Sequence, residues 1–436
     1  MLVSFRVENY RSYREGKTLS MVASNSGELP QNLIDVPEYN FKLLRTAVLY
    51  GPNASGKSNL LYAMNYLSDL LGSPLSRDLR VAPRSPHFAL NATAASRPTS
   101  FSTSFIFEKV LYEYSIAYHE GMIIEERFVA FPQSRPQTWF LRNRQDVEFN
   151  KTYLRGRKQA LRTLMQPGIP LLAVAAAFDH PQMGAPAGWI MGNLRERFAT
   201  SPPHVVNPRS RISAMRTARL CEDDPQFREW VNAFLVHADL GIRNVEVEIT
   251  REKVQQPFFV SAPDGSQVQE IREVHRSSHT PVFVHAGEDE FITKFNLADE
   301  SLGTQRLFGM LSEFYLALSA GRPTVVDELT ASIHPSLVRV LIGMFHDAKV
   351  ASRNAQLVFT THDTSLLSGR LFRRDQVWFT EKDRAGATDL YSLHDVKDVR
   401  ADDSFEKGYL RGRYGAIPFF REFDFPPSVK EATTFD

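Results

Sequence analysis

The stretch Gly51-Pro52-Asn53-Ala54-Ser55-Gly56-Lys57-Ser58 decides the fold of this chain. It matches the pattern G-x-x-x-x-G-K-[ST], in which the backbone N–H groups of a glycine-rich turn surround a polyphosphate. The apolar residues 47–50 precede it as a short buried strand, and residues 60–71 place leucine and methionine at the spacing of one helix face. Strand, glycine loop and helix stand in the order that the motif requires, so the sequence predicts nucleoside triphosphate binding.

Individual residues of this phosphate loop (residues 51–58) have separate expected roles. Lys57 is expected to reach the outer phosphates, where it also serves catalysis, and the Ser58 hydroxyl to bind Mg²⁺. The helix N-terminus adds attraction for negative charge. The predicted ligands are therefore ATP and Mg²⁺. The residues expected to bind the nucleotide from this segment are Asn53, Ala54, Ser55, Gly56, Lys57, Ser58 and Asn59.

The length and composition of the chain limit its number of domains, its binding partners and its location. The chain has 436 residues and a formal net charge of +1, so two or three domains fit and no overall excess of positive charge indicates nucleic acid. One cysteine, Cys221, excludes an intramolecular disulfide and a cysteine-built metal cluster. No stretch of about eighteen apolar residues runs without a charge, and no secretion signal is visible at the N-terminus. We therefore expect no membrane association and a cytoplasmic location.

The chain divides into three expected parts, 1–152, 153–290 and 291–436. The first carries the phosphate loop and a β-rich antiparallel meander with strands at 101–107, 111–118, 122–131 and 138–142. The second, rich in prolines between its elements, reads as an inserted, mainly helical arm. Its expected helices are 157–165, 171–178, 189–198 and 226–239, and its strand-like runs are 243–250, 257–261 and 281–284.

The third part alternates helices and strands, which predicts a mostly parallel sheet covered by helices. The expected elements are a helix at 304–320, a strand at 324–326, a helix at 336–348, a strand at 356–360, and a closing hairpin from 376–380 and 389–393. The predicted fold class is therefore α/β.

This third part also supplies a pair of carboxylates. The run Pro323-Thr324-Val325-Val326-Asp327-Glu328 is an apolar strand that carries Asp327 to its carboxyl end, where ligands bind in open α/β sheets. Asp327 is expected to bind Mg²⁺ through its hydration shell, and Glu328 to act as the general base toward water. A strand that ends in an exposed acidic turn is the alternative for this run taken alone.

Two flanking elements complete the pattern. Ser301 and Gly303 open a helix, and a helix N-terminus is an anion site. His362 stands just past the apolar strand 356–360, where it could hydrogen-bond a γ-phosphate. A lone histidine is more often structural, but the ordered set of phosphate loop, Ser-x-Gly, Asp-Glu and strand-His favours a nucleotide site.

That ordered set resembles the ABC-type ATPases, in the branch of SMC, RecF and OLD (overcoming lysogenization defect) proteins. Lys57 and Ser58 match the Walker A positions, Asp327 and Glu328 the Walker B positions, and His362 the switch histidine. Other matches are Ser301 and Gly303 (signature loop), 331–332 (D-loop), 333–335 (Leu-His-Pro turn), 5–12 (Asn-Phe-Arg-Ser turn) and 409–418 (C-terminal motif of stand-alone defence ATPases). The Ser-Leu-Gly-Thr-Gln signature fits the OLD-like branch rather than transporters, whereas Thr330 stands where an acidic residue is frequent.

The resemblance implies an ABC-type P-loop ATPase head with a mixed sheet, an antiparallel β subdomain and an inserted helical arm. It implies an ATPase switch that works as a homodimer or higher homo-oligomer with ATP sandwiched between heads. Because no acidic cluster resembling a TOPRIM nuclease follows, the expected function is control of a separate nuclease or toxin in an anti-phage or toxin-antitoxin-like system.

The alternative is a RecF-like or SMC-like ATPase of DNA repair that binds DNA. Two groups of basic residues could contact phosphates or could be solvated helix faces. They are Arg155, Arg157, Lys158 and Arg162, and Arg209, Arg211, Arg216 and Arg219.

Overall fold

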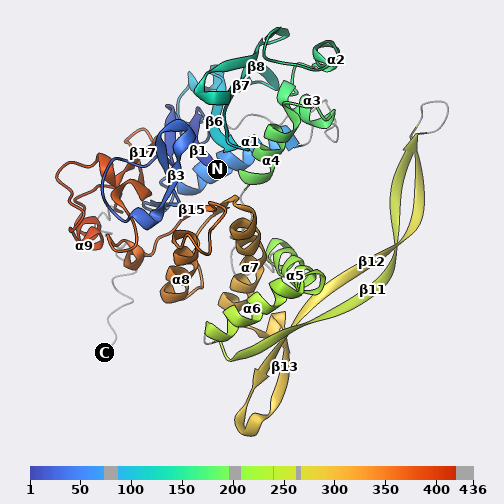
Figure 1. Cartoon of the computed structure of the whole chain (residues 1–436), viewed down its shortest axis with the longest axis vertical. Helices are drawn as coiled ribbons and strands as arrows, with labels where there is room; N and C mark the ends of the chain where they lie inside the picture. The colour runs from blue at the N-terminus through green and yellow to red at the C-terminus, as the bar shows by residue number, and fades with distance from the viewer. Residues whose placement is uncertain (73–86, 196–207, 239, 262–266, 419–436) are drawn as a thin grey trace, which may run out of the picture.

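A computed structural model describes residues 1–72, 87–195, 208–238, 240–261 and 267–418. Two sheets form the body of the molecule, and a long two-stranded ribbon projects from it (Figure 1). The buried residues form two large apolar clusters, one on each side of the sheet that carries the phosphate loop.

The sheet that carries the phosphate loop has five strands in the order β14-β15-β5-β16-β17. Their bounds are Pro323–Val326, Gln356–Thr360, Thr46–Tyr50, Val377–Lys382 and Thr388–Ser392. The first four pair in parallel and β17 is antiparallel. All residues of β5 are buried, as expected for a parallel strand with both faces covered. The predicted α/β class with a mixed sheet is confirmed.

Helices cover this sheet on both faces. Helix α1 (Lys57–Gly72) shares one cluster with Ala47 and Leu49 of β5. Helices α7 (Leu302–Ala320) and α8 (Pro335–His346) share the other cluster with Val48 and Tyr50. Alternate residues of β5 therefore face different helices, and the phosphate loop leaves the middle of the sheet between them.

The second sheet is antiparallel, with seven strands in the order β10-β9-β8-β7-β6-β1-β2. The predicted meander is confirmed as β6 to β9, and the N-terminal strands add to its edge. The bounds are β1 Leu2–Glu8, β2 Lys17–Ser20, β6 Thr99–Phe107, β7 Val110–His119, β8 Met122–Phe131, β9 Gln137–Asn143 and β10 Asp146–Phe149.

Helices α2 (Lys158–Leu164), α3 (Leu171–Ala177) and α4 (Gly184–Asn193) join the cluster of this second sheet and α1. A buried ion pair attaches α3 to the sheet. The Glu126 carboxylate accepts hydrogen bonds from the first N–H groups of α3 and pairs with Arg142 at 3.4 Å. This carboxylate caps the α3 N-terminus. The prediction of a helix at 189–198 was wrong in its bounds, since α4 starts at Gly184 with Pro186 in its first turn, where proline is tolerated.

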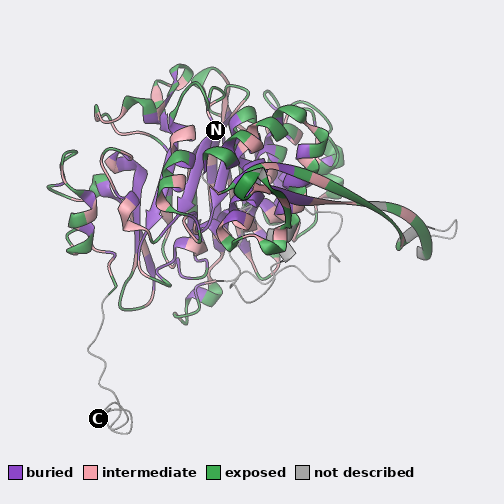
Figure 2. Ribbon diagram, turned by 90° about the horizontal axis from the view of Figure 1, so that it is seen from below, coloured by how far each residue is buried: buried purple, intermediate pink, exposed green. Residues whose placement is uncertain are grey.

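The ribbon consists of β11 (Ile242–Ser261) and β12 (Gln267–Ala286), paired antiparallel along their length. Twenty residues per strand span roughly 66 Å at about 3.3 Å per residue. Helices α5 (Pro208–Asp223) and α6 (Pro225–His237) pack against its base, where β13 (Ile292–Asn296) also pairs with β12. Figure 2 shows the ribbon leaving the body with an exposed surface. The three separate strand runs predicted here are parts of one continuous ribbon, and α5 was not predicted.

The segment 153–290 therefore packs in two places. Its first helices join the antiparallel sheet, and its later elements join α7. The three-part division of the chain stays a prediction.

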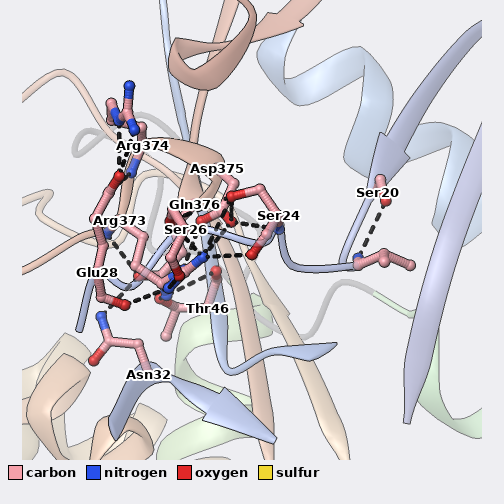
Figure 3. A network of polar contacts seen from close by, with 11 residues as sticks. Ser20, Ser24, Ser26, Glu28, Asn32, Thr46, Arg373, Arg374, Asp375 and Gln376 are labelled. Carbon is pink, nitrogen blue, oxygen red and sulfur yellow. Dashed lines mark hydrogen bonds and ion pairs between the residues drawn. The ribbon is translucent and has the colours of Figure 1, made fainter. Parts of the chain in front are cut away.

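A buried polar network fixes the end of the five-stranded sheet opposite the phosphate loop (Figure 3). Arg373 pairs with Asp375 at 2.7 Å, and Asp375 accepts a hydrogen bond from Ser24. Gln376, just before β16, accepts from Asn32 and donates to the Thr46 hydroxyl at the start of β5. These bonds join the N-terminal segment to two neighbouring strands of the sheet.

The remaining strands and the last α-helix of the described chain are short. They are β3 (Leu33–Val36), β4 (Phe41–Leu44) and α9 (Phe405–Leu410). No helix within the described residues has the length and apolar character needed to cross a membrane.

Candidate nucleotide site

The phosphate loop curls between β5 and α1 through residues with unusual backbone angles. Gly51 and Gly56 have φ of 152° and 118°, and Ala54 has φ of 60°. A Cβ on Gly56 would lie 2.3 Å from the Thr388 hydroxyl, so this position has no room for a side chain. Asn53 and Ala54 lie exposed on the loop, which leaves its outer face open for a ligand.

Neighbouring strands hold the loop in this shape. The Ser55 hydroxyl hydrogen-bonds Thr380 of β16 at 2.6 Å, and Thr388 of β17 donates to the Ser55 carbonyl at 2.7 Å. Asn59 donates to the Ser12 hydroxyl at 2.8 Å, so the N-terminal turn also braces the first turn of α1. The loop is pre-organised because three separate segments of the chain fix it.

Lys57 lies folded against the loop. Its ammonium donates to the carbonyls of Gly51 at 2.9 Å and Pro52 at 3.2 Å, and the residue is only 4% exposed. Burial lowers its pKa from 10.5 to about 8, although Glu328 and Asp327 act in the opposite direction. A buried cation held by neutral carbonyls is poised to exchange them for the oxygens of an anionic ligand.

Ser58, in the first turn of α1, contacts Asp327, the residue that follows β14. The Ser58 hydroxyl donates to Asp327 Oδ1 at 3.1 Å, and Thr360 of β15 donates to the same oxygen at 2.6 Å. This brings together residues 269 positions apart, as the parallel strand order requires. The hydroxyl and carboxylate are oxygen donors of the kind that Mg²⁺ takes, so the two residues fit the predicted metal.

Glu328 has a strained backbone. Its φ of 50° lies in the left-handed region, which a glutamate rarely adopts. Three hydrogen bonds hold it there: its N–H donates to the Thr360 hydroxyl at 2.8 Å, and Arg306 of α7 donates to the carbonyls of both Asp327 and Glu328. Strain that the surroundings enforce points to a functional position.

Glu328 and His362 face each other. His362 Nε2 lies 3.1 Å from Glu328 Oε1, with side chains 44% and 23% exposed. Burial alone would raise the pKa of Glu328, but the hydrogen bond from His362 and the charges of His362, Lys57 and Arg306 lower it overall. The carboxylate is therefore ionised at neutral pH and able to accept a proton.

Ser301 is the N-cap residue of α7, and Gly303 lies in its first turn. The Ser301 hydroxyl accepts from the Thr304 N–H at 3.1 Å and hydrogen-bonds the Thr304 hydroxyl, so it caps its own helix. Ser301 is exposed, and within the described chain it hydrogen-bonds Thr304 and Gln305 of the same helix. The structure thus brings the phosphate loop, Asp327, Glu328 and His362 together and leaves Ser301 facing outward.

Gly303 has a packing role that the sequence did not indicate. A Cβ there would lie 2.3 Å from the Ser332 carbonyl oxygen, in the segment that follows Glu328. Together with Arg306, this close approach ties the first turn of α7 to the turn that carries the carboxylates.

The basic groups are largely engaged within the chain. Lys158 donates to the Asn150 carbonyl and Arg162 to the Val147 carbonyl. Arg216 pairs with Glu313, and Arg219 pairs with Asp223. Arg155 and Arg157 are exposed, and the side chains of Arg209 and Arg211 lie outside the described part of the structure. These contacts favour structural and solvated roles for the described members.

Sequence reasoning missed two residues that organise the site, Thr360 and Arg306. A buried strand threonine carries no local signal, and only the pairing of β15 with β14 shows that its hydroxyl lies between the two carboxylate positions. Arg306 follows the Ser-x-Gly pattern by three residues, and this spacing is the signal that could have found it.

The sequence matches a family model described as "AAA domain, putative AbiEii toxin, Type IV TA system" over residues 47–167 and 224–368. The chain belongs to this AAA-domain family. The match includes the phosphate loop, both carboxylates and His362, and it omits residues 168–223, which carry α3, α4 and α5.

Comparison with solved structures finds similarity to the SMC head domain from Thermotoga maritima, at 10% sequence identity and a TM-score of 0.39. The alignment covers 90% of this chain and 98% of that chain. No match was found among curated proteins.

Proposed function

We propose that this protein is a Mg²⁺-dependent ATPase that acts as a conformational switch, with each ATP site completed by a second copy of the chain. The observation that carries the proposal is the cluster of Lys57, Ser58, Asp327, Glu328 and His362 at the carboxyl edge of one sheet.

ATP binding follows from the loop and its lysine. The Lys57 ammonium exchanges the carbonyls of Gly51 and Pro52 for β- and γ-phosphate oxygens, and the N–H groups of residues 53–59 surround the phosphates. Ser58 and Asp327 would hold Mg²⁺. Bound there, the metal supplies neutralisation of phosphate charge.

Hydrolysis follows from Glu328. This carboxylate takes a proton from a water molecule while the water oxygen bonds to the γ-phosphorus. The bond from phosphorus to the ADP oxygen then breaks, and its electron pair stays on ADP. With ATP bound, His362 would exchange its contact with Glu328 for a hydrogen bond donated to the γ-phosphate, while Thr360 and Arg306 keep Glu328 aimed at the water.

Completion by a second copy follows from Ser301. An exposed serine at the N-terminus of a 19-residue helix is a suitable partner for a γ-phosphate, yet it makes its own contacts within α7. In the ABC-type proteins that the motif set resembles, each signature loop meets the phosphate loop of the other subunit. ATP binding would thus favour a closed dimer.

The biological role that we propose is control of a separate effector, such as a nuclease or toxin, in an anti-phage or toxin-antitoxin-like system. The family description, which names a toxin of a type IV system, supports this context. The RecF-like alternative gains no support from the described members of the two basic groups, because Lys158, Arg162, Arg216 and Arg219 bond other residues of the chain.

The test compares two variants with the wild type for ATP binding and phosphate release. We expect Lys57→Ala to abolish or severely weaken ATP binding. Glu328→Gln should keep binding and lower turnover by about 10²- to 10⁴-fold, because loss of a general base affects only the step in which water attacks. Wild-type turnover by purified Glu328→Gln would refute the assignment.

A further inference from the structure

The base of the ribbon touches the segment that carries Ser301. His285, near the end of β12, lies with its Nε2 2.6 Å from Glu300 Oε1. The two side chains are only 19% and 9% exposed, so solvent competes little for this bond. Glu300 directly precedes Ser301, and its carbonyl accepts a hydrogen bond from the Gln305 side chain at 2.8 Å. The residue before the exposed serine is therefore held from both sides.

Apolar contacts make the same connection. Phe283 of β12 packs edge-on against Phe308 of α7, with ring centroids 5.2 Å apart. The His285 ring packs edge-on against Phe295 of β13 at 5.0 Å. The ribbon base and the first turns of α7 therefore pack directly against each other, whereas most described side chains farther along the ribbon are exposed.

We propose that His285 is a positioning residue for the ATP site, acting through Glu300 to fix the direction in which Ser301 faces a second copy of the chain. This inference rests on the proposed function. The ribbon base would thus act in dimer formation and not on the chain's own phosphate loop. Within the described residues, the hydrogen bonds and ring contacts of His285 and Glu300 do not involve residues 51–58.

The test uses the Glu328→Gln background, in which ATP binds without turnover. In this background His285→Phe keeps an aromatic ring against Phe295 but cannot donate to Glu300. His285→Gln retains an N–H donor. The matched control is Glu273→Gln, which removes an exposed ion pair with Lys253 on the distal ribbon. ATP-dependent dimerisation is measured by sedimentation velocity, and binding of a fluorescent ATP analogue is measured at monomer concentrations.

We expect His285→Phe to weaken ATP-dependent dimerisation by about tenfold per site, hence about a hundredfold for a symmetric dimer. His285→Gln should recover part of this loss, and Glu273→Gln should behave like its parent. Binding of the analogue by monomers should stay within about twofold of the parent for all three variants, because the phosphate loop is untouched.

Unchanged dimerisation in both His285 variants would overturn the inference. So would equal loss of monomer binding and dimerisation, which indicates general damage to the fold. If the Glu328→Gln parent itself forms no ATP-dependent dimer, the shared site of the proposed function fails, and the parent measurement alone reveals it.

Discussion

The phosphate loop and the segment around Ser301 both lie at helix N-termini, where anions bind favourably. They differ in how many contacts the same chain makes to each. Lys57 is buried, and Asp327, Glu328 and His362 lie at the same edge of the sheet as the phosphate loop. Ser301 is exposed and hydrogen-bonds residues of its own helix. The function proposed above accounts for this difference, because it places one half of the ATP site within a single chain and takes the other half from a second copy.

The largest expected effect concerns the exposed half. Ser301→Arg places a bulky cation where a partner's ATP would lie, and we expect ATP turnover to fall by at least about 100-fold. Binding of ATP to the single chain should stay within about threefold, because the change lies away from the phosphate loop.

The matched control is Ser404→Arg, which changes the exposed N-cap serine of α9 and costs about 1 kcal/mol of stability without affecting turnover. Equal loss of ATP binding and turnover in Ser301→Arg would mean that Ser301 serves its own phosphate loop.

The next effect concerns the buried half. Thr360→Val keeps the side-chain shape but removes the hydroxyl that bonds both Asp327 and the Glu328 N–H. We expect kcat to fall by about 10- to 100-fold, because the carboxylates lose their orientation, with a smaller change in ATP affinity. Phosphate release assays and equilibrium binding measure the two quantities.

Thr46→Val is the control at the other end of the same sheet, where the hydroxyl contacts His346 and Gln376. This variant should lower the free energy of unfolding by about 1–3 kcal/mol and leave kcat unchanged. A kcat for Thr360→Val within twofold of wild type would show that the carboxylates need no such support.

The smallest effect is a pH dependence. Lys57 has a pKa of about 8 in the free protein because of burial, and bound phosphates would raise it. The affinity for ATP should therefore be constant below about pH 8 and fall above it, approaching tenfold per pH unit. Isothermal titration from pH 7 to 9.5 measures it.

Lys57→Arg keeps its charge over this pH range and should lose the slope, whatever its absolute affinity. A flat profile in the wild type would contradict the buried position of the Lys57 ammonium.

Elements that one continuous stretch of residues defines were predictable from the sequence. The phosphate loop, the strand ending in Asp327 and the strand before His362 each combine a buried run with polar residues at its end, and β5, β14 and β15 follow them closely. The meander was predictable for the same reason, because its strands alternate apolar and polar residues.

Features that depend on distant contacts were not predictable. Residues 248–253 of β11 are all exposed, so Arg251-Glu252-Lys253 carries no apolar alternation, and only the pairing with β12 defines the strand there. The parallel pairing of β16 with β5 and the placement of Thr360 between two carboxylate positions likewise depend on the assembled sheet.

The most direct test of the shared site mixes two variants that are each inactive alone, Lys57→Ala and Ser301→Arg. A mixed dimer, prepared by co-expression with two affinity tags, contains one intact site made of the Ser301→Arg chain's phosphate loop and the Lys57→Ala chain's Ser301. We predict that verified mixed dimers regain ATP turnover, approaching half of the wild-type rate per dimer. No recovery in verified mixed dimers, together with full wild-type activity in a proven monomer, would contradict completion of the site by a second copy.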